Sequence, residues 1–345
     1  MKRTFETEKE KARRRFHEAA ALLGQTGEVL KRIPAEVREE AQEIRFRTGK
    51  PVSICTGNRT WFLTSTGALA PQATSLCPCI QPVQMQELFK VLCSYSLYSH
   101  EQEIREGYLT LRGGHRAGIC GTAAVREGQI LSIREISSIC LRIAREKPGA
   151  ADELFRRLSS TLEGGVLIAG APSSGKTTVL RDVARQLANG NRGRYYRVAV
   201  VDERGEIGSA CRGRAENDLG VSCDLLSGYP KAQGILQAVR VLSPEYILCD
   251  ELGSERDVQA VEAGIFSGAA MIATVHAGNR KELSARPICR RILETGAFGS
   301  VVILAGRGEP GRIAGIYRAG DLLDEGSRAF AVGSSLHSCR TGGVA

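Results

Sequence analysis

Residues 166–180 read Val166-Leu167-Ile168-Ala169-Gly170-Ala171-Pro172-Ser173-Ser174-Gly175-Lys176-Thr177-Thr178-Val179-Leu180. The apolar start of this stretch predicts a buried strand, and apolar side chains at helical spacing after Lys176 predict a helix. Glycines at 170 and 175 let the connecting loop pass close to a phosphate, and the amides that open the helix point at the anion. The stretch therefore predicts a phosphate-binding loop of the Walker A type.

Each part of this loop has an expected role in binding a nucleotide. Lys176 is expected to reach the β- and γ-phosphates, and the Thr177 hydroxyl is expected to hold Mg²⁺. The residues expected to surround the phosphates are Gly170, Ala171, Pro172, Ser173, Ser174, Gly175, Lys176, Thr177 and Thr178. A glycine-rich turn that binds nothing is the alternative, and the flanking strand and helix argue against it.

Composition limits the class of protein. A length of 345 residues favours two domains, and 42% hydrophobic residues suffice for packed cores. No apolar run approaches the roughly 18 residues that a membrane span needs. The start of the chain, residues 2–15, is charged and has no apolar segment behind it, so we expect a cytoplasmic protein made without a signal peptide.

The charge balance favours anionic partners. The formal net charge is +9, which suits a nucleotide, a nucleic acid or a membrane face, although most of the charge is expected on solvated surface. Aromatic residues make up only 5%, too few for the stacking platforms of a single-strand binder. The 11 cysteines are scattered without a C-x-x-C pair, which is typical of reduced, buried thiols.

The first part of the chain predicts a small α+β domain. We expect a helical extension over 1–33, formed by a helix at 5–32, and then a domain over 34–146. That domain would open with a helix from Pro34 to Arg45. Alternation of apolar and polar residues then predicts an antiparallel sheet. The predicted strands contain Ile44 and Phe46, Val52 and Ile54, and Trp61 and Leu63, and further strands are expected at 107–112, 117–125 and 129–134, after a loop at 71–82 and a helix at 83–98.

The second part predicts an α/β domain. Residues 147–150 contain Lys-Pro-Gly and form a candidate hinge, and a helix at 151–162 leads into the phosphate-binding loop. From there to residue 323 strands alternate with helices, which predicts a parallel sheet with its active site at the carboxyl ends of the strands. Residues 324–345 are rich in Gly and Ser and are expected to form a flexible tail.

Three of the predicted strands end in polar residues. One strand, 197–201, precedes Asp202 and Glu203; a second, 246–249, precedes Asp250 and Glu251; a third, 271–275, precedes His276. A carboxylate pair at a strand end suits hydrolysis of a magnesium nucleotide, because one acid orders the metal and the other orients or deprotonates water. A histidine on a buried strand is often a core residue, but the tip position of His276 favours a functional role.

These motifs together resemble a known superfamily. The phosphate-binding loop, Val200-Val-Asp-Glu-Arg-Gly-Glu206, Leu236-Gln-Ala-Val-Arg-Val-Leu-Ser-Pro-Glu-Tyr-Ile-Leu-Cys-Asp-Glu251 and Ala273-Thr-Val-His-Ala-Gly278 resemble the secretion ATPases of type II and type IV secretion and pilus machines. Within that superfamily the chain is similar to the stage III sporulation protein AA family of endospore-forming bacteria. The stretches at 43–51, 116–123 and 139–146 carry that closer similarity, which covers most of residues 34–320.

The resemblance implies a fold, an activity and partners. It implies a RecA-like P-loop ATPase domain behind the smaller N-terminal α+β domain, assembled as a hexameric ring with ATP and Mg²⁺ between the domains. It also implies a place in the mother cell, peripheral at the cytoplasmic face of the membrane. Its partners there would be membrane-embedded sporulation channel proteins that connect the mother cell to the forespore.

One departure from the superfamily leaves the catalytic base open. Secretion ATPases commonly carry Gly before the Walker B Glu, whereas this chain carries Asp250. The base is therefore either Glu251 or Glu203. We favour Glu251 for orienting water, with Glu203 or Asp202 supporting the metal.

The expected mechanism assigns the remaining roles. Lys176 and the loop amides neutralise the phosphates, Thr177 and Asp250 manage Mg²⁺, Glu251 orients water, and His276 senses the γ-phosphate. An arginine from the N-terminal domain or a neighbouring subunit would complete the charge clamp. The candidates near the hinge are Arg134, Arg142 and Arg145, and we favour Arg142.

Three other functions fit parts of the sequence. A GTPase switch fits the D-x-x-G pattern at 250–253, but no Asn-Lys-x-Asp is present to read guanine. A nucleic-acid-dependent ATPase or nucleic-acid binder fits the basic charge, and it predicts a steeply salt-dependent affinity. A nucleotide-gated assembly scaffold with little turnover predicts that Lys176 is required and Glu251 is not.

Overall fold

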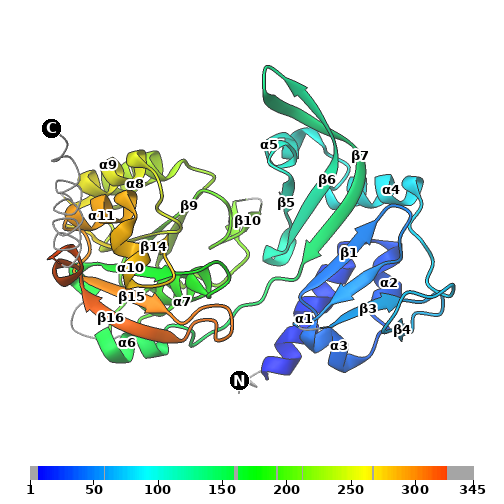
Figure 1. The fold of residues 1–345 in the computed structure, drawn as a ribbon, viewed down its shortest axis with the longest axis horizontal. Coiled ribbons are helices and arrows are strands. Elements are labelled where there is room, and N and C mark those ends of the chain that lie inside the picture. Colours follow the sequence, from blue (N-terminus) through cyan, green and yellow to red (C-terminus); the bar gives the residue numbers. More distant parts are fainter. Residues whose placement is uncertain are drawn as a thin grey trace, which may run out of the picture. The chain divides into compact units, whose positions relative to one another are not determined.

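The protein is described by a computed structural model that covers residues 7–324 except 58, 159–161, 192, 212 and 266–267. The chain forms two compact units (Figure 1). Unit 1 contains Met1–Arg145 and Ser209–Glu216, and unit 2 contains Glu146–Gly208 and Asn217–Ala345. The predicted flexible tail lies outside the described residues from position 325 onward.

Unit 1 combines helices with an antiparallel sheet. Its elements are α1 (Glu8–Ala21), α2 (Gln25–Leu30), α3 (Ala35–Glu40), β1 (Glu43–Arg47), β2 (Ser53–Cys55), β3 (Thr60–Leu63), β4 (Leu69–Ala70), α4 (Pro82–Leu92), α5 (Glu101–Arg105), β5 (Tyr108–Thr110), β6 (Arg116–Arg126), β7 (Gln129–Arg142), β10 (Ala210–Cys211) and β11 (Arg214–Ala215), with 3₁₀ turns at Tyr98–His100 and Arg112–Gly114.

The sheet of unit 1 confirms the predicted alternation. Its strand order is β4-β3-β2-β1-β7-β6-β5, and every neighbouring pair is antiparallel. On β1, Ile44 and Phe46 are fully buried and lie opposite Leu141 and Ile139 of β7. Strand β7 continues past the predicted end at 134, because its second half pairs with both β1 and β6.

The N-terminal helices differ from the prediction. Instead of one helix over 5–32, α1 and α2 are separated at Gly24, whose φ of +57° is incompatible with a continuous helix. Helix α3 ends at Glu40 rather than near Arg45, because the chain turns to non-helical angles at Ala41 before β1. Phe16 of α1 is fully buried in the same core as the sheet, so this segment packs as part of unit 1.

Unit 2 alternates strands and helices as predicted. Its elements are α6 (Asp152–Leu158), β8 (Val166–Gly170), α7 (Lys176–Ala188), β9 (Val198–Asp202), β12 (Cys223–Ser227), α8 (Lys231–Leu242), β13 (Tyr246–Cys249), α9 (Glu255–Ile265), β14 (Ala270–His276), α10 (Arg280–Ala285), α11 (Pro287–Glu294), β15 (Ser300–Leu304) and β16 (Ile313–Arg318), with a 3₁₀ turn at Leu162–Gly164.

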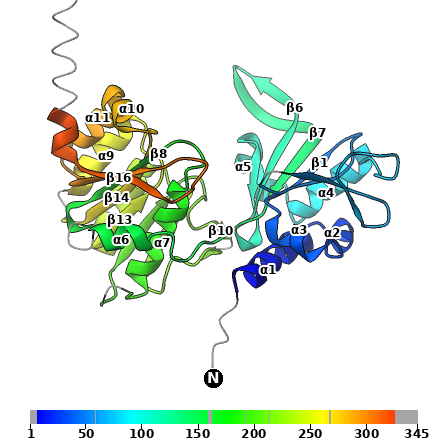
Figure 2. The ribbon, with the colours of Figure 1, turned by 60° about the horizontal axis from the view of Figure 1, so that its bottom comes forward.

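The sheet of unit 2 brings the predicted motifs to one edge. Its order is β12-β9-β13-β14-β8-β15-β16, and all neighbours are parallel except β15 and β16. The antiparallel β16 corrects the prediction of a wholly parallel sheet, and β12 is an edge strand that was not predicted. Figures 1 and 2 show α8, α9 and α11 on one side of this sheet and α6 and α7 on the other.

The core of unit 2 explains why this sheet holds its shape. Strands β8, β9, β13 and β15 are buried along their whole length, and the apolar residues of α8, α9 and α11 join the cluster on one face. Strands covered on both faces read as continuous apolar runs, as these do. A rigid central sheet therefore fixes the side chains that follow β8, β9, β13 and β14.

Candidate functional site

The phosphate-binding loop connects β8 to α7 and contains two glycines at which a side chain would meet close neighbours. Gly175 has a φ of +92°, and a Cβ there would lie 2.7 Å from the amide nitrogen of Gly311. A Cβ at Gly170 would lie 2.3 Å from the hydroxyl oxygen of Ser174. Helix α7 starts directly after Gly175 without a side-chain cap, so its first amides are directed at the loop.

The other loop residues divide between the cavity wall and its support. A cavity of about 460 Å³ is lined by Pro172, Ser173, Gly175, Lys176, Thr177, Thr178, Arg204, Glu206, Asp250, Glu251, His276 and Pro310. Gly170, Ala171 and Ser174 are not among the residues that line the cavity. Ser174 is fully buried, its carbonyl accepts from the Gly311 amide at 2.8 Å, and its hydroxyl has no hydrogen-bond partner among the described residues.

Lys176 is held inside the loop at the start of α7. Its Nζ donates to the carbonyls of Gly170 and Ala171 at 2.9 and 3.0 Å and lies 3.1 Å from Nδ1 of His276. Burial lowers the pKa of Lys176, and the neighbouring carboxylates of Asp250 and Glu251 oppose that shift. Only 7% of the residue is exposed, and it forms part of the cavity wall.

The second predicted acid pair follows β13 and reaches the loop. The Thr177 hydroxyl donates to Oδ2 of Asp250 at 2.5 Å, which joins the start of α7 to the end of β13. The hydroxyl of Thr274, buried on β14, donates to Oδ1 of Asp250 and accepts from the amide of Glu251 at 2.8 Å. Asp250 is therefore fixed from both sides and faces Thr177.

Glu251 lies at the centre of a chain of polar contacts. Its Oε1 is 2.7 Å from Nε2 of His276, and its Oε2 accepts from Nη1 of Arg204. Because Lys176 donates to Nδ1 of His276, the other ring nitrogen carries the proton and donates to Glu251. The chain of contacts runs Lys176, His276, Glu251, Arg204, and all four side chains line the same cavity.

Neither Asp202, the last residue of β9, nor Glu203 lies in the wall of the cavity. The carboxylate of Asp202 is 2% exposed and accepts from the amides of Glu206, Ile207 and Gly208 at 2.9, 3.1 and 2.7 Å. Its oxygens therefore hold the backbone of the loop in place, and its predicted role as a metal ligand remains a proposal. Glu203 lies 3.6 Å from Nζ of Lys231 and is not part of the cavity wall, which favours Glu251 as the base.

The three arginines proposed as fingers belong to unit 1, whereas the cavity is lined by unit 2 alone. Arg142 lies on β7, and its Nε is 3.5 Å from the Glu43 carboxylate. Arg145 donates to the backbone carbonyls of Glu39 and Ala41 at 2.5 and 2.7 Å, and burial lowers its pKa. Arg134 also lies on β7. A role for any of them remains a proposal.

Sequence reasoning missed two residues at the site. Arg204 lies in the quoted acidic stretch, but nothing in that stretch indicates that its partner is Glu251, 47 residues away. The sequence did contain a signal for Thr274, because this polar residue interrupts the apolar run of its strand. A buried hydroxyl must find a hydrogen-bond partner, and here the partner is Asp250.

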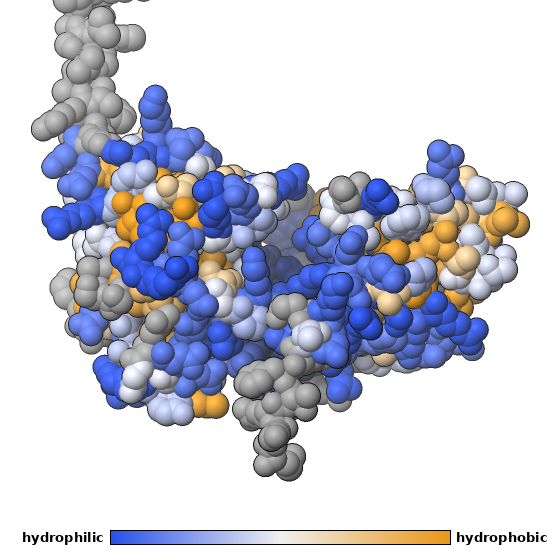
Figure 3. Space-filling view, turned by 90° about the horizontal axis from the view of Figure 1, so that it is seen from below, coloured by the Kyte–Doolittle hydropathy of each residue, from blue (hydrophilic) through white to orange (hydrophobic). Residues whose placement is uncertain are grey.

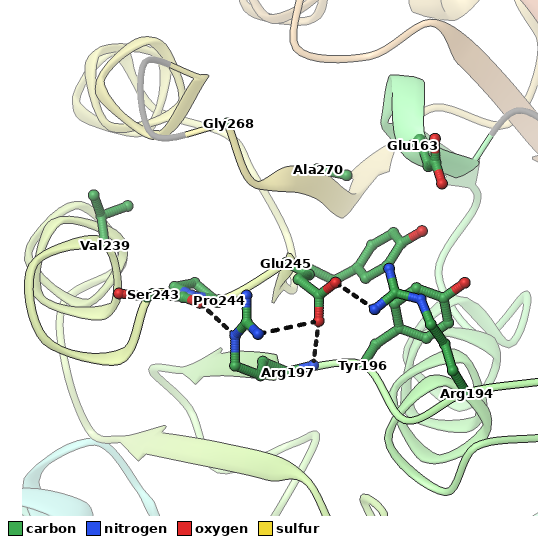
Figure 4. A pocket seen from close by; sticks show the side chains of 11 residues that line it. Glu163, Arg194, Tyr196, Arg197, Val239, Ser243, Pro244, Glu245, Gly268 and Ala270 are labelled. Atoms are coloured by element: carbon green, nitrogen blue, oxygen red, sulfur yellow. Dashed lines mark hydrogen bonds and ion pairs between the residues drawn. The ribbon is translucent and has the colours of Figure 1, made fainter.

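A second cavity of about 460 Å³ lies at the opposite, amino-terminal edge of the sheet (Figure 4). Here Arg194 and Arg197 both pair with Glu245, at 2.7 and 3.8 Å, and Arg194 stacks on the ring of Tyr196 at 4.0 Å. Figure 4 shows Glu245 between the two arginines, so both guanidinium groups of this wall have a partner within it. We place the candidate site at the other edge, where the loop is.

The residues of the first cavity fit a magnesium nucleotide. The uncapped amides of α7 and the Lys176 ammonium suit phosphate oxygens, and the hydroxyl and carboxylate oxygens of Thr177 and Asp250 suit Mg²⁺. Within the described ranges, no three His, Cys, Asp or Glu side chains are grouped so that they could hold a metal alone.

One face of the molecular surface is visible in Figure 3. It is largely hydrophilic, and the hydrophobic patches on it are separate from one another. Among the residues that the structure describes, no helix has the length and apolar character that a bilayer crossing requires.

Comparison with solved structures identifies the fold. The crystal structure of the pilus retraction motor PilT with bound ADP aligns with a TM-score of 0.54 and 13% identity, covering 85% of each chain. At this identity the likeness shows the fold alone. It is the RecA-like P-loop fold of the secretion ATPases, as predicted.

Comparison with known sequences identifies the family. The chain is 32% identical over 289 residues to stage III sporulation protein AA of Bacillus subtilis (strain 168), covering 84% of this chain and 90% of that protein. It is 28% identical over 204 residues to protein SEEDLING PLASTID DEVELOPMENT 1 of Arabidopsis thaliana, covering 57% of this chain and 26% of that protein. A family model described as "Sporulation stage III, protein AA" matches residues 13–323. The chain therefore belongs to the sporulation stage III protein AA family.

Proposed function

We propose that the protein is a magnesium-dependent ATPase, a secretion-type motor that couples hydrolysis to assembly of, or transport through, a channel between mother cell and forespore. One observation carries this proposal. A single cavity at the carboxyl ends of the strands collects Lys176, Thr177, Asp250, Glu251 and His276 around an uncapped helix start. These are the groups that phosphoryl transfer to water requires, namely a charge for the phosphates, oxygens for a metal and a carboxylate for the water.

Each residue of the cavity has its own role in the proposed hydrolysis of ATP. Lys176 and the first amides of α7 bind the β- and γ-phosphates, and this binding draws the ammonium away from Nδ1 of His276, now 3.1 Å away. Thr177 and Asp250 hold the metal, which neutralises phosphate charge when it is bound. Glu251 orients the attacking water and accepts its proton. His276 links Lys176 to Glu251 and so reports the phosphate to the base.

We also propose an assembly and a location. A hexameric ring, peripheral at the cytoplasmic face of the mother-cell membrane and bound to membrane-embedded sporulation channel proteins, agrees with the family and with the motor-type fold. Mass determination in solution, with and without ATP, tests the ring. A particle that stays monomeric under both conditions would contradict it.

A nucleotide-gated scaffold with little turnover is a second candidate. Both carboxylate oxygens of Glu251 are hydrogen-bonded within the protein, to His276 and Arg204, which favours a slow or gated base. In this case the nucleotide would organise the complex without being consumed.

Two substitutions separate the candidates. For a motor, Lys176→Ala and Glu251→Gln each abolish ATP hydrolysis and sporulation, and Glu251→Gln still binds ATP, because its amide keeps the shape but not the charge. We expect turnover to fall by at least about 10²-fold in both variants. If the protein is a scaffold, cells that carry Glu251→Gln should sporulate normally, whereas cells that carry Lys176→Ala should not. The measurements are phosphate release by the purified protein and spore counts.

A further inference from the structure

Arg204 is an arginine of the cavity that the proposed mechanism does not use. It lies in the turn after β9, its side chain is 58% exposed, and it lines the cavity together with the phosphate-binding loop. Its guanidinium donates to Oε2 of Glu251, the proposed base. Any role for Arg204 in hydrolysis therefore rests on the proposed function and adds a residue to it.

The turn that carries Arg204 is fixed to the phosphate-binding helix. Arg181 of α7 donates to the backbone carbonyls of Glu206 and Ile207 at 2.5 and 2.7 Å. On the other side, Asp202 accepts from three successive amides of the same loop. The backbone around Arg204 is thus held to the helix that begins at Lys176, while the Arg204 side chain itself remains accessible.

The ion pair between Arg204 and Glu251 is weak enough for Arg204 to leave Glu251 for another partner. The side chains of Arg204 and Glu251 are 58% and 31% exposed, and ion pairs in such surroundings add little to stability. A phosphate carries more charge than a carboxylate and accepts two parallel bonds from a guanidinium. A γ-phosphate that enters this cavity therefore competes successfully for Arg204.

The exchange would change the state of Glu251. In the structure, His276 takes up one lone pair on one oxygen and Arg204 one lone pair on the other, so water can reach only the lone pairs that these two partners leave. Movement of Arg204 to the phosphate frees Oε2. The arrival of the triphosphate and the release of the base are then one event.

We propose that Arg204 is a catalytic residue that holds Glu251 in the absence of triphosphate and moves to the γ-phosphate when ATP binds. It would act from the same unit as the phosphate-binding loop. The bond to the β-phosphate breaks as water attacks the γ-phosphorus, the water proton passes to Glu251, and Arg204 stabilises the charge on the γ-phosphate oxygens. ADP lacks the γ-phosphate and leaves Arg204 on Glu251.

The test compares Arg204→Ala and Arg204→Lys with wild type and with a control. Arg157→Ala is the matched control, because Arg157 is a half-exposed arginine of unit 2 paired with Glu153 at 3.2 Å on α6. We expect kcat for ATP to fall by at least about 10²-fold in Arg204→Ala. We also expect affinity for ATP to fall while affinity for ADP is unchanged, a difference that a merely structural role would not produce. Arg204→Lys should retain part of the preference for ATP.

Each outcome supports or overturns the role of Arg204. Arg204→Ala with wild-type kcat and the wild-type ratio of ATP to ADP affinity overturns it, as does equal loss of both nucleotides in a folded variant. If Arg204→Ala unfolds at a lower temperature than Arg157→Ala, then kcat and the ratio of ATP to ADP affinity are judged on Arg204→Lys instead. If the wild type itself neither binds nor hydrolyses ATP, the proposed function fails. If the wild type hydrolyses ATP and the substitutions of Arg204 have no effect, only the proposed role of this arginine is overturned.

Discussion

Among single residues, Glu251 is one of several non-glycine residues with a left-handed backbone conformation, and it is the one that lies at the proposed catalytic position. Its φ of +57° is uncommon for a residue other than glycine. The conformation is held in place because Lys231 donates to its carbonyl at 2.6 Å and Thr274 accepts from its amide at 2.8 Å. Strained residues of this kind cluster at functional sites, where the surrounding contacts maintain them. The backbone thus supports the choice of Glu251 as the base.

Burial of a second residue, His115, makes the stability of unit 1 depend on pH. His115 is fully buried, its Nδ1 accepts from the Ala144 amide at 2.9 Å, and its Nε2 has no partner among the described residues. Burial lowers its pKa to about 4, and the charge of Arg15 adds to the effect, against that of Glu18. The folded protein therefore resists protonation at a site that the unfolded chain protonates readily.

The resulting prediction is loss of stability in mild acid. Above about pH 6.5 the histidine is neutral in both states, and as the pH falls toward 4 only the unfolded state gains the proton, so the free energy of unfolding drops by roughly 3 kcal/mol. Urea unfolding between pH 7 and 4 measures this. His115→Asn keeps an acceptor for Ala144 and should reduce the slope, and the share that comes from other groups with lowered pKa values, such as His17, Glu18 and Glu245, should remain. An unchanged slope in that variant would refute the assignment.

Residue roles could be predicted where a contiguous motif or the end of an apolar strand carries them, as for Asp250, Glu251 and His276. Lys176 and Thr177 belong to one contiguous motif, so their places in the cavity were predictable. The pairing of Arg204 with Glu251 and of Thr274 with Asp250 joins separate strands, and it depends on strand order and register. A single sequence does not determine these, which is why both partners were missed.

At the scale of elements, the same limit explains which strands were found. Strands β8, β9 and β13 are buried apolar runs and were predicted. Strand β12 reads Cys-Asp-Leu-Leu-Ser at the sheet edge, and only one of its residues is fully buried, so it has neither a long apolar run nor a clean alternation. The direction of β16 is set by the short connection from β15, which leaves no room for a crossover helix.

The contact between α1 and α2 gives a prediction at this scale. A Cβ on Gly27 of α2 would lie 1.8 Å from the carbonyl oxygen of Ala20 on α1, where only backbone movement could relieve the clash. We therefore expect Gly27→Ala to destabilise the protein by about 1–3 kcal/mol, although alanine is the better helix former. Urea denaturation measures the change.

Gly57→Ala is the control for this prediction. Gly57 also lies in unit 1, has no positive φ, and a Cβ there would meet only the Gln42 side chain at 3.6 Å. Its effect should stay within about 0.5 kcal/mol. Equal effects of the two substitutions, or a more stable Gly27→Ala, would mean that the two helices do not pack as closely as described.

At the scale of the whole molecule, the chain connects its two units more than once. Besides the passage near residue 145, the segment Ser209–Glu216 groups with unit 1 although the residues on both sides of it belong to unit 2. The sequence predicted a single hinge at 147–150 and contained no sign of this excursion. The segment directly follows the loop of Asp202, whose turn carries Arg204. Motion about the hinge remains a prediction.

Equilibrium binding of ATP in the presence of Mg²⁺ shows whether the cavity around the phosphate-binding loop holds ATP through Lys176. The wild type and Lys281→Ala, which removes an exposed lysine of α10, should bind ATP with the same affinity. Folded Lys176→Ala should lose ATP binding. Absence of binding by the wild type, or equal binding by all three proteins, would contradict the account.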